Sequence, residues 1–215
     1  MKKKILITAG ASFLLLAGLI AGYLLFFAPV DWRYGIDTAD RGIEAGIFPW
    51  IGASNPELVI HEYVDYDCPH CPGTHRRLRS IIARHLDKVR LVRHDYARMR
   101  CAPNNAQDRF ASCELVRAAI CASKHVDFWQ WNDAVMSSPR YKSDAPLAGY
   151  VPAMVAKFKI SGDAFDKCMY SKETIDRAQK IYLDVKKNHV NATPTYIVDG
   201  KKTTLALIRE KVNQL

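Results

Sequence analysis

Two cysteines separated by two residues, Cys68 and Cys71, form the pattern in this chain with the most direct chemical use. The apolar run Leu58–Val64 before them predicts a strand, and Thr74–Leu86 after them has apolar positions at helical spacing. At a helix start, unpaired backbone N–H groups and the helix dipole favour a thiolate. The second sulfur lies one turn later and can form a disulfide with the first. The pattern therefore predicts a reversible thiol–disulfide centre.

Two other uses of this spacing are a zinc site and a purely structural disulfide. Zinc needs a second pair of ligands at similar spacing. The remaining cysteines, Cys101, Cys113, Cys121 and Cys168, contain no such pair. A structural disulfide would make no use of the helix-start position. Redox chemistry is the interpretation that the context favours.

The N-terminal 30 residues carry three lysines followed by an uncharged, mostly apolar run from Ile5 to Val30. A spanning helix needs about 20 apolar residues, whereas the apolar region of a cleaved signal peptide has about 7–15. No small-x-small cleavage pattern ends the run. We expect residues 1–30 to be a signal anchor with its lysines in the cytoplasm and the remaining chain outside. A cleaved signal peptide is the alternative.

Charge and cysteine content suit an exported domain. All six cysteines lie beyond the apolar run, and disulfides persist in oxidising compartments. The formal charge of +9 includes three lysines before that run, which leaves +6 (9 − 3) for the rest. The densest basic cluster, residues 75–79, is interpreted as a solvated helix face, with anionic lipid headgroups as a weaker possibility. A nucleic-acid role is not expected for an exported chain.

The rest of the chain suits a single domain with a long helical block inside it. Residues 31–56 show little periodicity and predict a tether and lead-in, so the domain is expected over 57–215. The block at about 105–188 is too long for a loop and is interpreted as an inserted helical subdomain. The remaining expected elements are a strand at 89–94, helices at 111–123, 128–137 and 172–187, a hairpin at 195–204 and a closing helix at 205–213.

Taken together, these features resemble the DsbA-like branch of the thioredoxin superfamily. The resemblance runs from about residue 56 to the C-terminus. Its carriers are the segment Glu62–Cys71, the helical insertion, and the segment Ala192–Gly200 that contains Thr193-Pro194. It implies an α/β, thioredoxin-like fold with an inserted helical subdomain, here preceded by one transmembrane helix. The spacing of the other cysteines is similar to that of members that partner vitamin K epoxide reductase-like oxidoreductases.

The resemblance assigns roles within the Cys68-Pro69-His70-Cys71 motif. Cys68 is expected to be the nucleophile and Cys71 the buried resolving thiol. His70 would add positive charge beside the Cys68 sulfur, and a stabilised thiolate makes the disulfide form more oxidising. Pro72-Gly73 departs from a regular helix and predicts a kink there, which leaves the depth of Cys71 open.

Three further residues enter through the same resemblance. Glu62 stands at the position of a buried acid that relays protons to Cys71, although an ordinary carboxylate on the solvent face of a strand fits the sequence equally well. Thr193 and Pro194 match the loop that faces the disulfide, with the proline cis and the threonine backbone available to a bound peptide. A trans proline opening a strand is the alternative.

The four other cysteines are expected to form structural disulfides. Cys113 and Cys121 are two turns apart on one expected helix, too far to bond each other. The resemblance implies the pairs Cys101–Cys113 and Cys121–Cys168. Four free buried thiols are the alternative, which an oxidising compartment disfavours.

The expected function is that of a thiol–disulfide oxidoreductase tethered to the bacterial inner membrane, with its catalytic domain on the periplasmic side. It would donate its disulfide to exported cysteine-containing proteins and be reoxidised by a quinone-linked membrane oxidase, DsbB-like or vitamin K epoxide reductase-like. No cofactor or metal is expected beyond the Cys68–Cys71 disulfide. A reductase or isomerase on the same fold is the close alternative, and a metal- or protein-binding module the more distant one.

Overall fold

A computed structural model describes residues 16–18, 31–97, 101, 111–139 and 147–215. The chain divides into two compact units, residues 1–31 and 32–215. Within the described ranges, no helix has the length and apolar character needed to cross a membrane. The expected anchor at residues 1–30 lies outside those ranges except for 16–18, which are helical.

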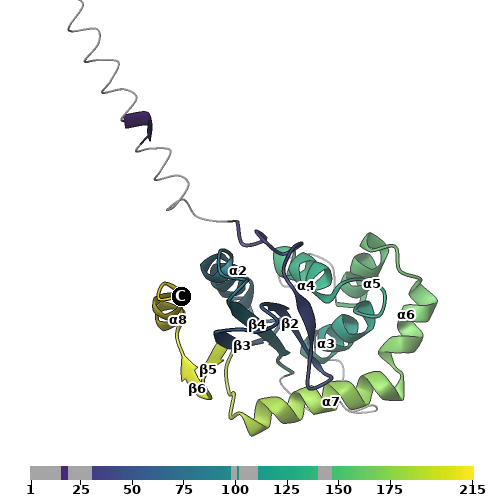
Figure 1. Ribbon diagram of the computed structural model, residues 1–215. Helices are drawn as coiled ribbons and strands as arrows, with labels where there is room; N and C mark the ends of the chain where they lie inside the picture. The colour runs from purple at the N-terminus through teal and green to yellow at the C-terminus, as the bar shows by residue number, and fades with distance from the viewer. Residues whose placement is uncertain (1–15, 19–30, 98–100, 102–110, 140–146) are drawn as a thin grey trace, which may run out of the picture. The chain divides into compact units, whose positions relative to one another are not determined.

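The larger unit is built on a six-stranded sheet in the order β1-β2-β4-β3-β5-β6 (Figure 1). Central strands β3 and β4 are parallel and the four other neighbouring pairs are antiparallel. A parallel pair needs a crossover, and helix α2 (Cys71–Ile82) provides it. The strands are β1 (Arg41–Glu44), β2 (Phe48–Gly52), β3 (Leu58–Val64), β4 (Val89–Asp95), β5 (Thr195–Val198) and β6 (Lys201–Thr203).

Strands β1 and β2 correct the interpretation of residues 31–56 as a tether and lead-in. They form an antiparallel hairpin, and β2 pairs with β4 through the register Trp50↔Val92. The turn between them holds Ala45 and Gly46 at positive φ, the region that favours glycine. Four-residue β1 lies at the sheet edge without an alternating burial pattern, so its sequence carries little strand signal. The domain therefore begins before residue 57.

Helices cover both faces of the sheet. Figure 1 shows α2 and α8 (Leu205–Val212) on one side and α7 (Lys172–Lys187) on the other. Ile60 packs in the core on the α2 side, whereas Tyr63 packs with Val185 of α7. Because side chains alternate along a strand, Glu62 shares the α2 side with Ile60.

The helical insertion lies between β4 and β5, as expected. It contains α3 (Ala111–Ala122), α4 (Phe128–Ser137), α5 (Leu147–Lys157), α6 (Gly162–Met169) and α7. Trp129 and Trp131 of α4 are buried in its core. The structure contains the disulfide pairs that the resemblance implied, Cys101–Cys113 and Cys121–Cys168, with Cα–Cα distances of 5.5 and 5.9 Å. They join α3 to the segment before it and to α6.

Candidate active site

The two motif cysteines lie at the N-terminal end of α2, in the connection that follows β3: Cys68 precedes the helix and Cys71 begins it. His70 is the N-cap residue and Cys71 the first residue of the helix, which then runs to Ile82. Pro72 lies in the first turn, where the missing N–H has no helical partner to lose. The helix continues without a break through Pro72-Gly73, where the sequence predicted a kink. Cys71 is completely buried, which answers the question of its depth.

The Cys68 sulfur lies against the loop that contains Pro194. Cys68 is 5% exposed, and both motif cysteines are free thiols in this structure. The Cys68 Sγ donates a hydrogen bond to the Thr193 carbonyl oxygen at 3.5 Å. The Thr193–Pro194 peptide bond is cis. Two segments 125 residues apart in the chain thus meet at one sulfur.

The surroundings give the two sulfurs opposite acidities. Burial alone would raise the pKa of Cys68. Hydrogen bonds from Cys71, from the Thr193 side chain and from the backbone of His70 and Cys71 outweigh it and lower that pKa below the ordinary 9.0. Burial, followed by the hydrogen bond with Cys68, raises the pKa of Cys71 well above 9.0. A reactive outer thiolate beside a protonated inner thiol suits stepwise disulfide exchange.

His70 contributes to the lowered pKa of Cys68 through its backbone hydrogen bond. Its imidazole is exposed at the surface, and a role for the charge of this ring stays a prediction. Side-chain hydrogen bonds from Cys71 and Thr193, followed by main-chain groups at the helix start, therefore stabilise the thiolate.

Glu62 is completely buried beneath the motif, which excludes the solvent-face alternative. The Nδ1 atom of His75 lies 2.7 Å from its Oε2, and Nη1 of Arg93 lies 3.9 Å from the same oxygen. Burial raises the pKa of the Glu62 carboxyl, but the charge and hydrogen bond of His75, with Arg93 and Arg79, outweigh it and lower the pKa below 4.5. Glu62 is thus an ionised buried carboxylate.

His75 and its neighbours on α4 are functional candidates that the sequence interpretation missed. The residue 75–79 cluster was expected to be a solvated face, yet His75 is completely buried and Arg79 is 1% exposed. Nε2 of His75 lies 3.2 Å from Nδ2 of Asn132, and that amide also donates to Asp133 at 3.1 Å. His75 follows Cys71 by four residues, so the two share one helix face. The four-residue spacing between Cys71 and His75 was the sequence signal that could have identified His75 as a neighbour of the redox motif.

A second histidine–carboxylate group lies on the α7 side of the sheet. His94 Nδ1 is 2.9 Å from Oδ2 of Asp184, which also accepts a hydrogen bond from the Tyr63 hydroxyl at 3.0 Å. His94 Nε2 is 3.0 Å from Nδ1 of His61. No group of acidic, histidine and cysteine side chains suited to a metal ion occurs among the described residues.

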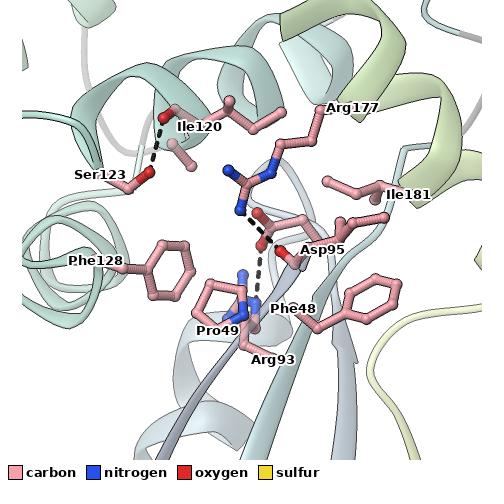
Figure 2. Close-up of a pocket in the computed structure, with 11 residues that line it drawn as sticks. Phe48, Pro49, Arg93, Asp95, Ile120, Ser123, Phe128, Arg177 and Ile181 are labelled. Atoms are coloured by element: carbon pink, nitrogen blue, oxygen red, sulfur yellow. Dashed lines mark hydrogen bonds and ion pairs between the residues drawn. The ribbon is translucent and has the colours of Figure 1, made fainter. Parts of the chain in front are cut away.

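A small pocket lies where β2 and β4 meet the helical insertion. Figure 2 shows the Arg93 guanidinium turned toward Asp95, with Arg177 reaching in from α7. Arg93 Nε is 2.9 Å from Asp95 Oδ1, so Arg93 lies between two buried carboxylates, Asp95 and Glu62. The cavity measures about 10 Å³, room for a single water molecule. It is too small for a substrate or an organic cofactor.

Comparison with known proteins places this geometry in context. A family profile described as thioredoxin matches residues 45–215. The solved structure of α-DsbA1 from Wolbachia pipientis superposes with a TM-score of 0.61 and 19% identity, covering 77% of this chain and 89% of that one. The thiol-disulfide exchange protein α-DsbA2 from the same organism gives 0.59 and 20%, covering 78% and 86%.

One curated relative is much longer than this chain. The Na(+)/H(+) antiporter NhaA of Herminiimonas arsenicoxydans is 25% identical over 201 residues, which cover 91% of this chain but 30% of the antiporter. The chain thus spans less than a third of the length of that relative.

Proposed function

Because this chain belongs to the thioredoxin family and its similar solved structures are DsbA-like proteins, we propose that it is a thiol–disulfide oxidoreductase that oxidises exported cysteine-containing proteins. The observation that carries the proposal is the opposite acidity of the two motif sulfurs. Cys68 is at the helix start with a lowered pKa, and Cys71 is buried beside it with a raised one. That asymmetry defines an attacking sulfur and a resolving sulfur.

The proposed reaction transfers two electrons from a substrate dithiol to the motif. A substrate thiolate attacks Sγ of Cys68 in the disulfide form. The substrate–Cys68 bond forms while the Cys68–Cys71 bond breaks, and Cys71 takes the electron pair and then a proton. A second substrate thiolate attacks the substrate sulfur, which forms the substrate disulfide and releases Cys68 as a thiolate.

Stabilisation of the Cys68 thiolate supports oxidation as the direction of the reaction. A lower thiol pKa favours the reduced form of the motif and raises its reduction potential. A quinone-linked membrane oxidase, DsbB-like or vitamin K epoxide reductase-like, would return the motif to its disulfide form. Reduction or isomerisation of disulfides on the same fold is the alternative direction.

The proposed setting is the periplasmic face of the bacterial inner membrane. The apolar run from Ile5 to Val30, preceded by three lysines, supports a single-pass anchor. Two disulfides in the helical insertion support an oxidising compartment.

Equilibration with glutathione buffers tests the direction of the reaction. We expect a reduction potential above about −200 mV, and a value close to that of thioredoxin, about −270 mV, would support the reductase alternative. A fluorescent dithiol peptide should be oxidised by the disulfide form of the protein but not by Cys68→Ser. Cys71→Ser is the matched control: once glutathione disulfide has formed a mixed disulfide with its Cys68 and released glutathione, that mixed disulfide should persist, because the resolving thiol is missing. Tight stoichiometric binding of zinc by the fresh dithiol protein would instead favour the metal-binding alternative.

A further inference from the structure

His75 occupies an unusual position for a titratable side chain. It lies one turn after Cys71 on the same face of α2, and both side chains are completely buried. Its Nδ1 meets the carboxylate of Glu62, which rises from β3 directly beneath the helix. The imidazole therefore joins the Glu62 carboxylate to the buried helix face that carries the resolving sulfur.

The charged and polar groups around His75 come from every element packed against it. Glu62 of β3 is the nearest of them, at 2.7 Å. Asp133 of α4 approaches Nε2 at 3.8 Å, and the Trp32 ring lies edge-on at 6.3 Å between centroids. Among the described residues, the charged and polar groups around His75 and its partners include Glu62, Arg79, Arg93, Asn132 and Asp133, with the Cys71 sulfur one helical turn away.

One oxygen of Glu62 is left for another partner. Oε2 is occupied by His75, whereas Oε1 is buried and has no hydrogen-bond partner within the described part of the chain. Tyr196 stands opposite Glu62 in the β3–β5 register, and its buried hydroxyl likewise lacks a partner there. Burial raises the pKa of Tyr196, and the charges of Glu62 and Cys71 add to that rise.

Resting on the proposed disulfide exchange, we infer that His75 is a positioning residue that, through Glu62, supplies a proton to Cys71 when the Cys68–Cys71 bond breaks. It takes the proton back when that bond forms again. In the first step the Cys71 sulfur receives the electron pair of the broken bond. The proton leaves His75 Nδ1 for Glu62 Oε2, and Glu62 delivers a proton to the sulfur.

The protonation states of the pair support this assignment. A carboxyl with a lowered pKa holds no proton at neutral pH, so Glu62 alone is a poor store. Burial lowers the pKa of His75, but Glu62 and Asp133 outweigh it and raise that pKa above 6.5. Of the two groups, the imidazole of His75 therefore has the greater affinity for the proton. Buried Cys71, with its raised pKa, is the group that needs it.

Nε2 of His75 keeps its proton throughout the proposed step, because the proton that moves leaves Nδ1. Asp133 Oδ1 lies 3.8 Å from Nε2, and the Asn132 amide lies 3.2 Å from the same atom. Helix α4 of the insertion thereby contacts the group that holds the proton.

The first experiment compares His75→Gln with His94→Gln. Glutamine keeps an N–H donor for the carboxylate but removes the titrating ring, and His94→Gln makes the same change on the opposite side of the sheet. The measured rate is the release of glutathione from its mixed disulfide with Cys68, followed against pH. We expect His75→Gln to lower this rate at neutral pH by about 10- to 100-fold and to change its pH profile. General acid–base catalysis usually contributes about 100- to 10,000-fold, so the expected loss lies at or below the lower end of that range. His94→Gln should match the wild type.

The second experiment needs no variant and so does not depend on whether His75→Gln folds. The pKa of His75 is followed by NMR of protein labelled with ¹³C-histidine, in the oxidised and the reduced forms. Because coupling between sites is reciprocal, a histidine that governs the Cys71 proton must have a higher pKa in the reduced form, which carries the Cys68 thiolate. Equal His75 pKa values in the two forms would overturn the inference, as would an unchanged pH profile in a folded His75→Gln. Failure of the wild type to exchange with glutathione would overturn the proposed function instead.

Discussion

Two histidine–carboxylate pairs lie on opposite sides of the same sheet and differ in what surrounds them. His75 and Glu62 are completely enclosed between β3 and α2 and adjoin the redox motif. His94 and Asp184 lie between β4 and α7, and the Asp184 side chain is 19% exposed. Asp184 also accepts hydrogen bonds from Tyr63 and Asn188, whereas one Glu62 oxygen has no such partner in the described structure.

The difference separates a structural ion pair from a pair suited to proton transfer. Asp184 has its oxygens satisfied by several donors and is partly hydrated, so the loss of one partner leaves others. Glu62 depends on His75 and two arginines in an enclosed space, and an unpaired buried charge is costly. The energy of the Glu62–His75 pair therefore depends strongly on a single proton. Such a pair is costly for stability, but it is useful next to a thiol that must gain and lose a proton.

The largest expected effect is on stability. His75→Ala should lower the free energy of unfolding by about 3–5 kcal/mol, because it leaves the Glu62 carboxylate buried without its nearest partner. His94→Ala should cost about 1–3 kcal/mol, since Asp184 keeps its other hydrogen bonds. Urea unfolding of the two oxidised variants measures both losses. Equal losses would show that the two pairs are energetically equivalent.

The pH dependence of stability should have opposite signs on the two sides. Because the pKa of His75 is raised in the folded state, its contribution is complete below pH 6.5 and is lost as the pH rises through the folded pKa. Burial, with the charge of His94, lowers the pKa of His61 in the folded state. The effect of His61 on stability is therefore opposite to that of His75: the free energy of unfolding falls as the pH drops below 6.5.

Unfolding free energies of His75→Gln and His61→Gln between pH 5 and pH 9 test this contrast. The stability of His75→Gln should no longer decline as the pH rises on the alkaline side. The stability of His61→Gln should no longer show the part of the acid decline that begins near pH 6.5. Asp184, whose pKa is lowered, continues to destabilise both variants as the pH falls below about 4. Glu62 adds to this acid decline in His61→Gln but less in His75→Gln, because His75 is the main group that lowers the Glu62 pKa against burial. The same change in both variants would contradict the assignment.

A smaller effect is expected from removing single hydroxyl groups. Tyr63→Phe deletes the donor to Asp184 and should cost about 0.5–1.5 kcal/mol without altering thiol chemistry. Tyr66→Phe deletes the buried donor to Asn132 Oδ1 on the redox side, with a similar cost. Only Tyr66→Phe should also shift the pH profile of glutathione release. A shift in Tyr63→Phe instead would move the proton pathway to the other side of the sheet.

The smallest effect is expected at the exposed histidine of the motif. His70→Ala keeps the backbone N–H that contacts Cys68, so the pKa of Cys68 should stay below 9.0 and change by less than about one unit. Thiolate absorbance against pH measures it in the wild type and the variant. A return of the Cys68 pKa to 9.0 would restore the imidazole as the principal cause.

Local sequence patterns were sufficient to predict most of the helices and strands and to identify the two reacting cysteines. The apolar run before Cys68, the helical spacing after it and the Asp199-Gly200 turn each indicate their own element, because strand, helix and turn preferences act over a few residues. The hairpin of β1 and β2 escaped this reasoning. Its edge strand has four residues and gains its stability from pairing with residues far along the chain.

Only the tertiary structure decided which polar residues surround the motif. Glu62 fitted a buried acid and a surface carboxylate equally well in the sequence, and residues 75–79 suggested a solvated basic face. Burial of Glu62 and His75 results from packing α2 over β3 and α4 over α2, which brings into contact residues up to 57 positions apart. Desolvation and charge pairing depend on distance in space, so the proton affinities at this site exist only in the folded chain.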